Sequence, residues 1–167
     1  MKSVFILFLI ISFSCFSQNT IEKRKAFVLE IAANETQQYK TEIAESYFFV
    51  KDKTLQIYCG EKVFVECEII NDSIAKMKVV EKNLNPKKTI EIDFTQDSKN
   101  RKEISTMLEV KNPFGKDLIY EAIMLTPGNK KWKATSIIPV RANLVSYETW
   151  PQAIVSLVLI NWKLKEF

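Results

Sequence analysis

The segment TIEIDFT, residues 89–95, has the pattern that decides the fold of this chain. Ile90, Ile92 and Phe94 are apolar, and the two residues between them are acidic. Successive side chains of a β-strand point to opposite faces, so a period of two is typical of a strand with one buried face. The segment therefore predicts a strand whose apolar side lies on a hydrophobic core.

The same alternation recurs along the chain, with turn-like residues between most of the segments. Residues 36–45 are ambiguous, because their composition fits either a helix or a strand. SYETWPQ, residues 146–152, is expected to be a loop. The other predicted strands are AFVLEIA (26–32), ESYFFV (45–50), TLQIYC (54–59), VFVECEII (63–70), IAKMKVV (74–80), ISTMLEV (104–110), DLIYEAIML (117–125), WKATSIIPV (132–140) and AIVSLVLINWKL (153–164).

This succession of strands predicts an all-β fold, because no strands alternate with helices as in a parallel sheet. About ten strands in one chain favour an antiparallel two-sheet β-sandwich, immunoglobulin-like only in the broad architectural sense. The Cys…Trp…Cys pattern of true immunoglobulin domains is absent. An up-and-down β-barrel is the alternative. We expect residues 18–167 to form one all-β domain.

Two hairpins are expected within this fold. Residues 54–59 and 63–70 are predicted to pair over the turn Gly60-Glu61-Lys62. Residues 117–125 and 132–140 are predicted to pair over TPGN, where Pro127 and Gly128 suit the central positions of a type II turn.

The N-terminal sequence MKSVFILFLIISFSCFSQ predicts export. Lys2 precedes an uncharged run over residues 4–16, which is shorter than the ~20 residues that span a membrane. We expect residues 1–17 to be a cleaved signal peptide of a bacterial secreted or periplasmic protein with no later transmembrane segment. Lipoprotein anchoring at Cys15 is an alternative, but the bulky Phe13 fits a lipoprotein signal poorly.

Cys59 and Cys67 are predicted to be free and buried. In the expected hairpin, Cys59 pairs with Val63 and Cys67 with Leu55, which places the two cysteines roughly 13 Å apart at the rise of a strand. A disulfide needs Cα atoms within about 7 Å. Both thiols also lie on the apolar parity of their strands, so no disulfide is expected.

The charge pattern argues against a nucleic-acid partner. The sequence has 24 Lys and Arg and 20 Asp and Glu, and a near-balance with scattered charges gives no large basic field. The small basic clusters KNRK (99–102) and NKKWK (129–133) are interpreted as solvated turns.

The chain lacks the residues that most catalytic mechanisms require. The chain has no His and only three Gly, which excludes histidine-activated nucleophiles and glycine-rich phosphate loops. No metal site or cofactor is expected. Carboxylate pairs at i, i+2, Glu66/Glu68 and Glu91/Asp93, leave a glycoside hydrolase as a weak alternative. However, the polar face of any strand produces the same spacing.

Four residues are the best candidates for a binding surface. Trp132 follows a turn, Trp150 precedes Pro151 in the segment expected to be a loop, and Phe114 and Lys116 lie in the turn NPFGKD. Trp162, by contrast, has the apolar parity of its strand and is expected in the core.

Export, an all-β fold and few catalytic groups together favour a non-catalytic binding or interaction module. Its unknown partner would be a protein or a glycan of the cell envelope. The alternative is a lipocalin-like carrier of a small apolar ligand, although the Gly-x-Trp opening strand of lipocalins is absent.

Overall fold

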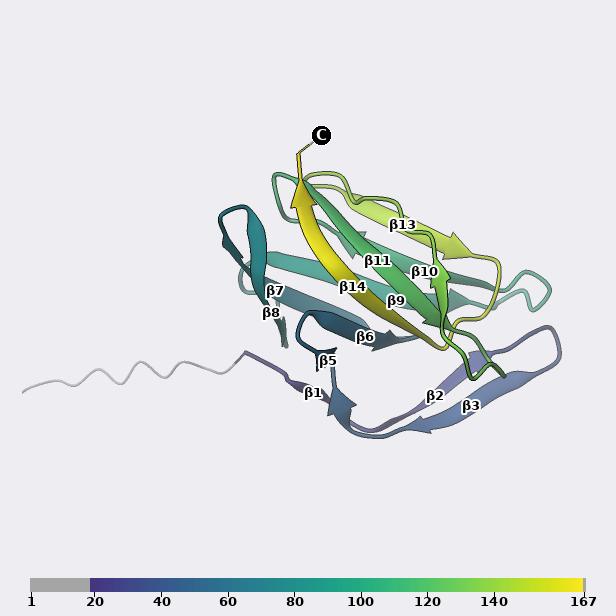
Figure 1. Cartoon of the computed structure of the whole chain (residues 1–167). Coiled ribbons are helices and arrows are strands. Elements are labelled where there is room, and N and C mark those ends of the chain that lie inside the picture. The colour runs from purple at the N-terminus through teal and green to yellow at the C-terminus, as the bar shows by residue number, and fades with distance from the viewer. Residues whose placement is uncertain (1–18, 167) are drawn as a thin grey trace, which may run out of the picture.

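The computed structural model describes residues 19–166 (Figure 1), and within them the chain forms fourteen β-strands and no helix. The predicted signal peptide and Cys15 lie outside the described residues. The strands are β1 (Lys23–Arg24), β2 (Phe27–Ala32), β3 (Gln38–Ile43), β4 (Ser46–Tyr47), β5 (Phe49–Lys51), β6 (Thr54–Tyr58), β7 (Lys62–Ile70), β8 (Ser73–Val80), β9 (Thr89–Asp97), β10 (Ser105–Lys111), β11 (Asp117–Leu125), β12 (Lys133–Thr135), β13 (Val145–Trp150) and β14 (Ser156–Lys165).

Ten of these strands form two antiparallel sheets that pack face to face. Sheet I has the strand order β13-β10-β9-β7-β8, and sheet II has the order β12-β11-β14-β6-β5. Both sheets keep free edge strands, so the fold is an open sandwich rather than the barrel considered as the alternative. The predicted all-β sandwich is confirmed.

The core consists of the inward-facing residues that the apolar/polar alternation of the sequence predicted to be buried. Ile90, Ile92 and Phe94 of β9 are completely buried, and so are Leu157 and Leu159 of β14. Burying such a side chain contributes roughly 1.5–3 kcal/mol relative to leaving it exposed. The opposite face of β9 carries the two acidic residues and remains partly solvated.

The hairpin predicted between residues 54–59 and 63–70 is wrong, because β6 and β7 belong to different sheets. The Cys59 N–H donates to Val155 O beside sheet II, and the Gly60 N–H donates to Phe94 O of sheet I. Residues 59–61 are therefore a crossover between the sheets. Cys59 and Cys67 are nevertheless free and buried, as predicted. Their separation in a hairpin was the wrong reason for that result.

The ambiguous segment 36–45 contains strand β3, which pairs with β2 in a separate two-stranded hairpin. Leu29 and Ile31 of β2 are buried in the main core. In Figure 1 this hairpin lies beneath the two sheets, so it covers one side of the core.

The hairpin predicted for residues 117–125 and 132–140 forms only in part. β11 pairs with β12 through three residues, whereas its extensive partner is β14. Beyond Thr135 the pairing is interrupted, since Pro139 has no N–H to donate and the Ile138 N–H is bonded to the Glu148 carboxylate at 2.7 Å. Val140 pairs with β11 again, as an isolated antiparallel bridge to Leu118.

The segment expected to be a loop around Trp150 is instead strand β13 at the edge of sheet I. Its side chains alternate between exposed positions and positions that are half-buried or, at Trp150, buried. The sequence did not reveal this alternation, because the segment contains few apolar residues. In the part of the chain that the structure describes, no helix is long and apolar enough to cross a membrane.

Candidate functional site

A surface groove of about 610 Å³ runs along strand β2. Four consecutive residues of β2, from Phe27 to Glu30, line one side of it. The crossover at residues 59–61 and Phe48 line the other side. No residue of β3 lines the groove, so it follows the edge of β2 that faces away from β3.

Within residues 19–166, that edge of β2 presents backbone groups that have no backbone partner. The backbone of Ala32 points away from β3. Its N–H donates to the side-chain amide of Gln96 at 2.8 Å, and its C=O accepts from the same amide at 2.9 Å. Backbone groups of alternate residues in an antiparallel pair point the same way. The N–H and C=O of Val28 and Glu30 therefore point into the groove, where Gln96 provides no partner for them. The edge can accept one more strand.

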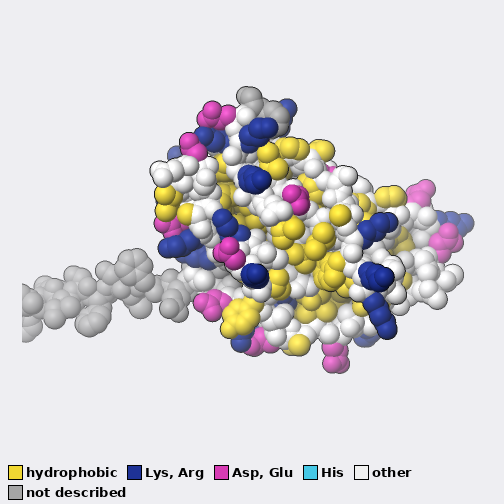
Figure 2. Space-filling model, viewed as in Figure 1, with side chains coloured by type: hydrophobic (Ala, Val, Ile, Leu, Met, Phe, Trp, Pro, Cys, Tyr) yellow, Lys and Arg dark blue, Asp and Glu magenta, His cyan; other side chains and the backbone are white. Residues whose placement is uncertain are grey.

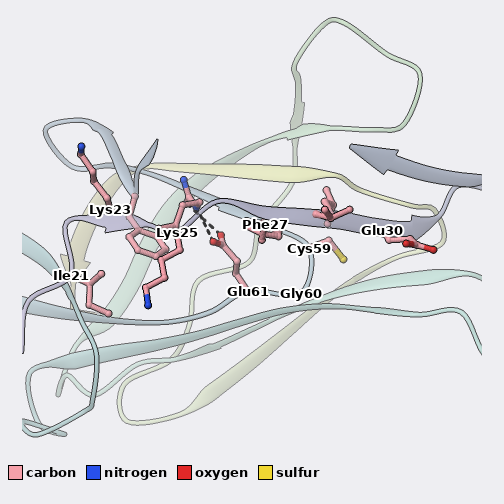
Figure 3. Close-up of a pocket in the computed structure, with 12 residues that line it drawn as sticks. Ile21, Lys23, Lys25, Phe27, Glu30, Cys59, Gly60 and Glu61 are labelled. Atoms are coloured by element: carbon pink, nitrogen blue, oxygen red, sulfur yellow. Dashed lines mark hydrogen bonds and ion pairs between the residues drawn. The ribbon is translucent and has the colours of Figure 1, made fainter. Parts of the chain in front are cut away.

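The floor of the groove is apolar. Leu29, Cys59 and Phe48 are buried, with 3%, 4% and 8% of their surface exposed. Phe27 is half-buried and packs edge-on against Tyr58, with ring centroids 6.0 Å apart. Figure 3 shows the Cys59 side chain beside β2, between Phe27 and Glu30. An extended ligand would find apolar contacts below it and backbone partners along its side.

One end of the groove is fixed by the buried Arg24. Its guanidinium forms an ion pair with Glu61, with Nε 2.8 Å from Oε1. Dashed lines mark the contacts of the Glu61 carboxylate in Figure 3. It also donates to Ser46 Oγ, Tyr47 O and Gln56 O.

Two aromatic rings complete the surroundings of this guanidinium, Phe48 at 4.5 Å and Tyr58 at 5.0 Å from Cζ to the centroid. All the donor directions of Arg24 are therefore occupied within the protein. Its role is to hold the N-terminal segment and strand β4 against sheet II, not to bind a ligand.

The thiol in the groove is not a nucleophile. Burial raises the pKa of Cys59 to about 11, although a backbone hydrogen bond from Gly60 opposes this effect. Nucleophilic cysteines have a lowered pKa, because the thiolate is the reactive form. Cys59 is protonated at neutral pH and acts as an apolar residue of the floor.

The carboxylate pairs are each engaged by lysines. Lys78 and Lys76 contact Glu66 and Glu68, and Lys111 and Lys62 contact Glu91 and Asp93. Hydrogen bonds from Asn85 and Lys78 lower the pKa of Glu66.

A glycosidase needs one carboxyl group with a raised pKa as its general acid, whereas the resolved shift at Glu66 has the opposite direction. Among residues 19–166 there is also no cluster of three metal-ligating side chains.

The four residues chosen from the sequence lie away from the groove. Phe114 and Trp150 are buried, and Trp150 donates its Nε1–H to Thr135. Lys116 is half-buried between Asp72 and Glu166, at 2.9 Å from each carboxylate. Trp132 is 41% exposed. These residues form no common surface.

Sequence reasoning missed the groove because both of its walls depend on long-range contacts. Residues 26–32 were correctly predicted as a strand, but their sequence does not reveal which edge stays unpaired. Cys59 was correctly placed in the core, and only the crossover brings it beside β2.

Compared with known proteins, the chain matches no family model, no curated protein and no solved structure.

Proposed function

We propose that this protein is an exported, non-catalytic β-sandwich that binds an extended segment of another protein along the free edge of β2. The observation that carries the proposal is the groove in which unpaired backbone groups of Val28 and Glu30 lie above an apolar floor. Addition of a strand to an exposed edge is a common mode of peptide recognition. A protein segment uses both features, whereas a glycan would not need a strand edge.

The geometry predicts the chemistry of the bound segment. Two outward-facing residues of β2 offer four backbone hydrogen bonds, each worth about 0.5–1.5 kcal/mol net. Side chains of the added strand alternate between the floor and solvent. We therefore expect apolar residues at every second position of the segment, facing Leu29, Cys59 and Phe48.

The test is selection of peptides from a random display library against the protein secreted by an expressing cell. Val28→Pro removes an N–H that faces the groove while leaving the bonds of β2 to β3 intact. We expect it to weaken the binding of selected peptides by about two- to tenfold, the equivalent of one backbone hydrogen bond.

Thr149→Pro is the matched control. The bond from Asn112 N to Leu144 O sets the pairing of β13 with β10, so the Thr149 N–H faces outward. This variant should bind the selected peptides unchanged. Recovery of no peptide, or equal losses in the two proline variants, would refute strand addition at β2.

Export is tested separately. Mass spectrometry of the secreted protein should find an N-terminus near Gln18. A lipid-modified Cys15 at the N-terminus would instead make the protein a lipoprotein.

A second candidate function uses the same groove. Its volume of about 610 Å³ lies in the range of small-molecule sites, about 300–1,000 Å³, so it supports a carrier of a small apolar ligand. A fatty acid needs no strand edge and should therefore bind the wild type and Val28→Pro equally.

A further inference from the structure

The loop that joins β11 to β12, residues 126–132, carries an exposed tryptophan. Trp150 and Trp162 donate their indole N–H groups to Thr135 Oγ1 and Lys53 O. Trp132 is 41% exposed, and its indole N–H has no acceptor within residues 19–166. A tryptophan in this position combines a large apolar surface with an unused donor.

The lysines around Trp132 are equally unpaired. Lys130, Lys131 and Lys133 are exposed, and their ammonium groups form no ion pair or hydrogen bond with any described residue. The lysines on the outer face of sheet I, by contrast, each pair with a carboxylate of a neighbouring strand. The positive charge of this loop is therefore not compensated locally.

The whole end of the sandwich around this loop is basic. The hollows beside residues 126–128 and beside residues 101–105 share Asn34 and Gln152, so the two loops lie at one end of the molecule. The basic residues there are Lys99, Arg101, Lys102, Lys130, Lys131 and Lys133, and the acidic ones are Glu35, Asp97 and Glu103.

An apolar strip continues from Trp132 onto sheet II. Extending the β11–β12 register by one residue places Trp132 opposite Leu125, on the same face as Ile123 and Val158. Figure 2 shows hydrophobic side chains gathered over β11 and β14 on this face. Trp132 therefore connects the partly exposed apolar residues of this face, Ile123 and Leu125, with the basic loop.

We propose that this loop docks the protein onto a bilayer containing anionic phospholipid. Tryptophan favours the membrane interface, where its ring is buried and its N–H remains wet. Lysine stems lie along apolar surface while the ammonium groups reach lipid phosphates.

A protein partner fits less well, because a stable protein interface needs about 800 Å² on each side. The loop itself, with one tryptophan and three exposed lysines, provides less area than that, and the apolar strip beside it is interrupted by the carboxylate of Glu121. An anionic bilayer needs no such area, because its phosphates can pair with the uncompensated lysines of the loop.

Docking is limited to the interface. Glu121 is exposed in the apolar strip of β11, where the Asn161 side chain donates to it at 2.9 Å. A carboxylate is costly to bring into hydrocarbon. The sheet face therefore stays at the headgroup level, and only the loop enters the interface.

The test measures binding of the secreted protein to vesicles of phosphatidylcholine with and without phosphatidylglycerol. We expect binding only with the anionic lipid, reduced by high salt. Replacing Lys130, Lys131 and Lys133 with Gln should lower the partition coefficient roughly fivefold per lysine, which corresponds to about 1 kcal/mol each. Trp132→Phe should remove the quenching of tryptophan fluorescence by brominated lipid, since the two other tryptophans are buried.

The matched control replaces Lys82 and Lys87 with Gln. Both are exposed and lie in the loop before β9, at the end of that strand opposite residues 98–104. This control should lose less binding per lysine than the loop variant. Equal losses, equal binding to neutral vesicles or no vesicle binding would each overturn the proposal.

A heparin arm distinguishes lipid from a soluble polyanion. If heparin binds as tightly as the anionic vesicles, and Trp132→Phe changes neither, the loop is only a polyanion site. An acidic protein is excluded as the required partner when protein-free vesicles bind. The inference does not depend on the peptide groove, because Val28→Pro should bind vesicles like the wild type.

Discussion

Replacement of Arg24 should be among the most destabilising single changes in this protein. The Arg24 and Glu61 side chains are 3% and 14% exposed, and their ion pair is supported by hydrogen bonds to three further oxygens. Removing one partner of such a pair leaves the other charge buried and costs about 3–5 kcal/mol. We expect Arg24→Ala to lower the free energy of unfolding by this amount.

Urea unfolding measures the loss directly. With a slope of about 2 kcal/mol/M, the unfolding midpoint should fall by about 2 M. The melting temperature should fall by about 10 °C for a chain of this length. A loss below about 1 kcal/mol would contradict the assignment of Arg24 as the anchor of the N-terminal segment.

A double-mutant cycle separates the ion pair from lost packing. Arg24→Met keeps an apolar side chain between Phe48 and Tyr58, and Glu61→Gln keeps the acceptor that the Tyr58 N–H uses at 2.8 Å. Because the double variant has no buried charge left unpaired, it should be more stable than the sum of the single changes implies, by about 2 kcal/mol. Additive losses would refute a direct coupling of Arg24 with Glu61.

Two further predictions concern buried groups. Cys59 and Cys67 should react slowly with thiol reagents in the native state and rapidly in urea, because burial raises their pKa to about 11 and about 12. These values exceed the unfolded pKa of about 8.5. The contribution of the two thiols to the free energy of unfolding is therefore fully present below about pH 8.5 and is lost as pH rises towards about 12. Rapid labelling in the native state would contradict their burial. Asn112→Ala should cost about 3 kcal/mol, because this buried amide donates to three backbone carbonyls and accepts from the Phe114 N–H. The control Asn129→Ala removes an exposed amide and should change urea stability by less than about 0.5 kcal/mol, so equal effects would refute the role of Asn112.

The turn before β11 shows how far local sequence reasoning reaches. The segment NPFGKD was expected to form a turn, and the Asn112 side chain accepts the Phe114 N–H within it, as a turn-forming Asn does. The same amide also donates to Val140 O and Arg141 O, far along the chain. Those bonds explain why Asn112 is buried, and the local sequence does not predict them.

The tryptophans show the same division. Trp162 was expected in the core from the parity of its own strand, and it is buried and stacked on Tyr120. Trp150 and Trp132 were expected to be partly exposed, because each lies beside a turn or a proline. Only Trp132 is exposed, since β13 forms and carries Trp150 to an acceptor on Thr135.

The sequence by itself determined most of the strands, their apolar faces and the class of fold, although it left β3 ambiguous and missed β13. These follow from alternation, which depends only on neighbouring residues and on the geometry of an extended chain. It also placed both thiols in the core, because cysteine on an apolar parity is buried with its neighbours.

Only the tertiary structure decided which sheet each strand joins and which edges remain free. Backbone hydrogen bonds are nearly the same for every residue, so a strand does not encode its partner. Gln96 bonds Ala32 across 64 positions of sequence, and the residues 59–61 cross between sheets instead of closing a hairpin. The groove along β2 exists because of these distant contacts.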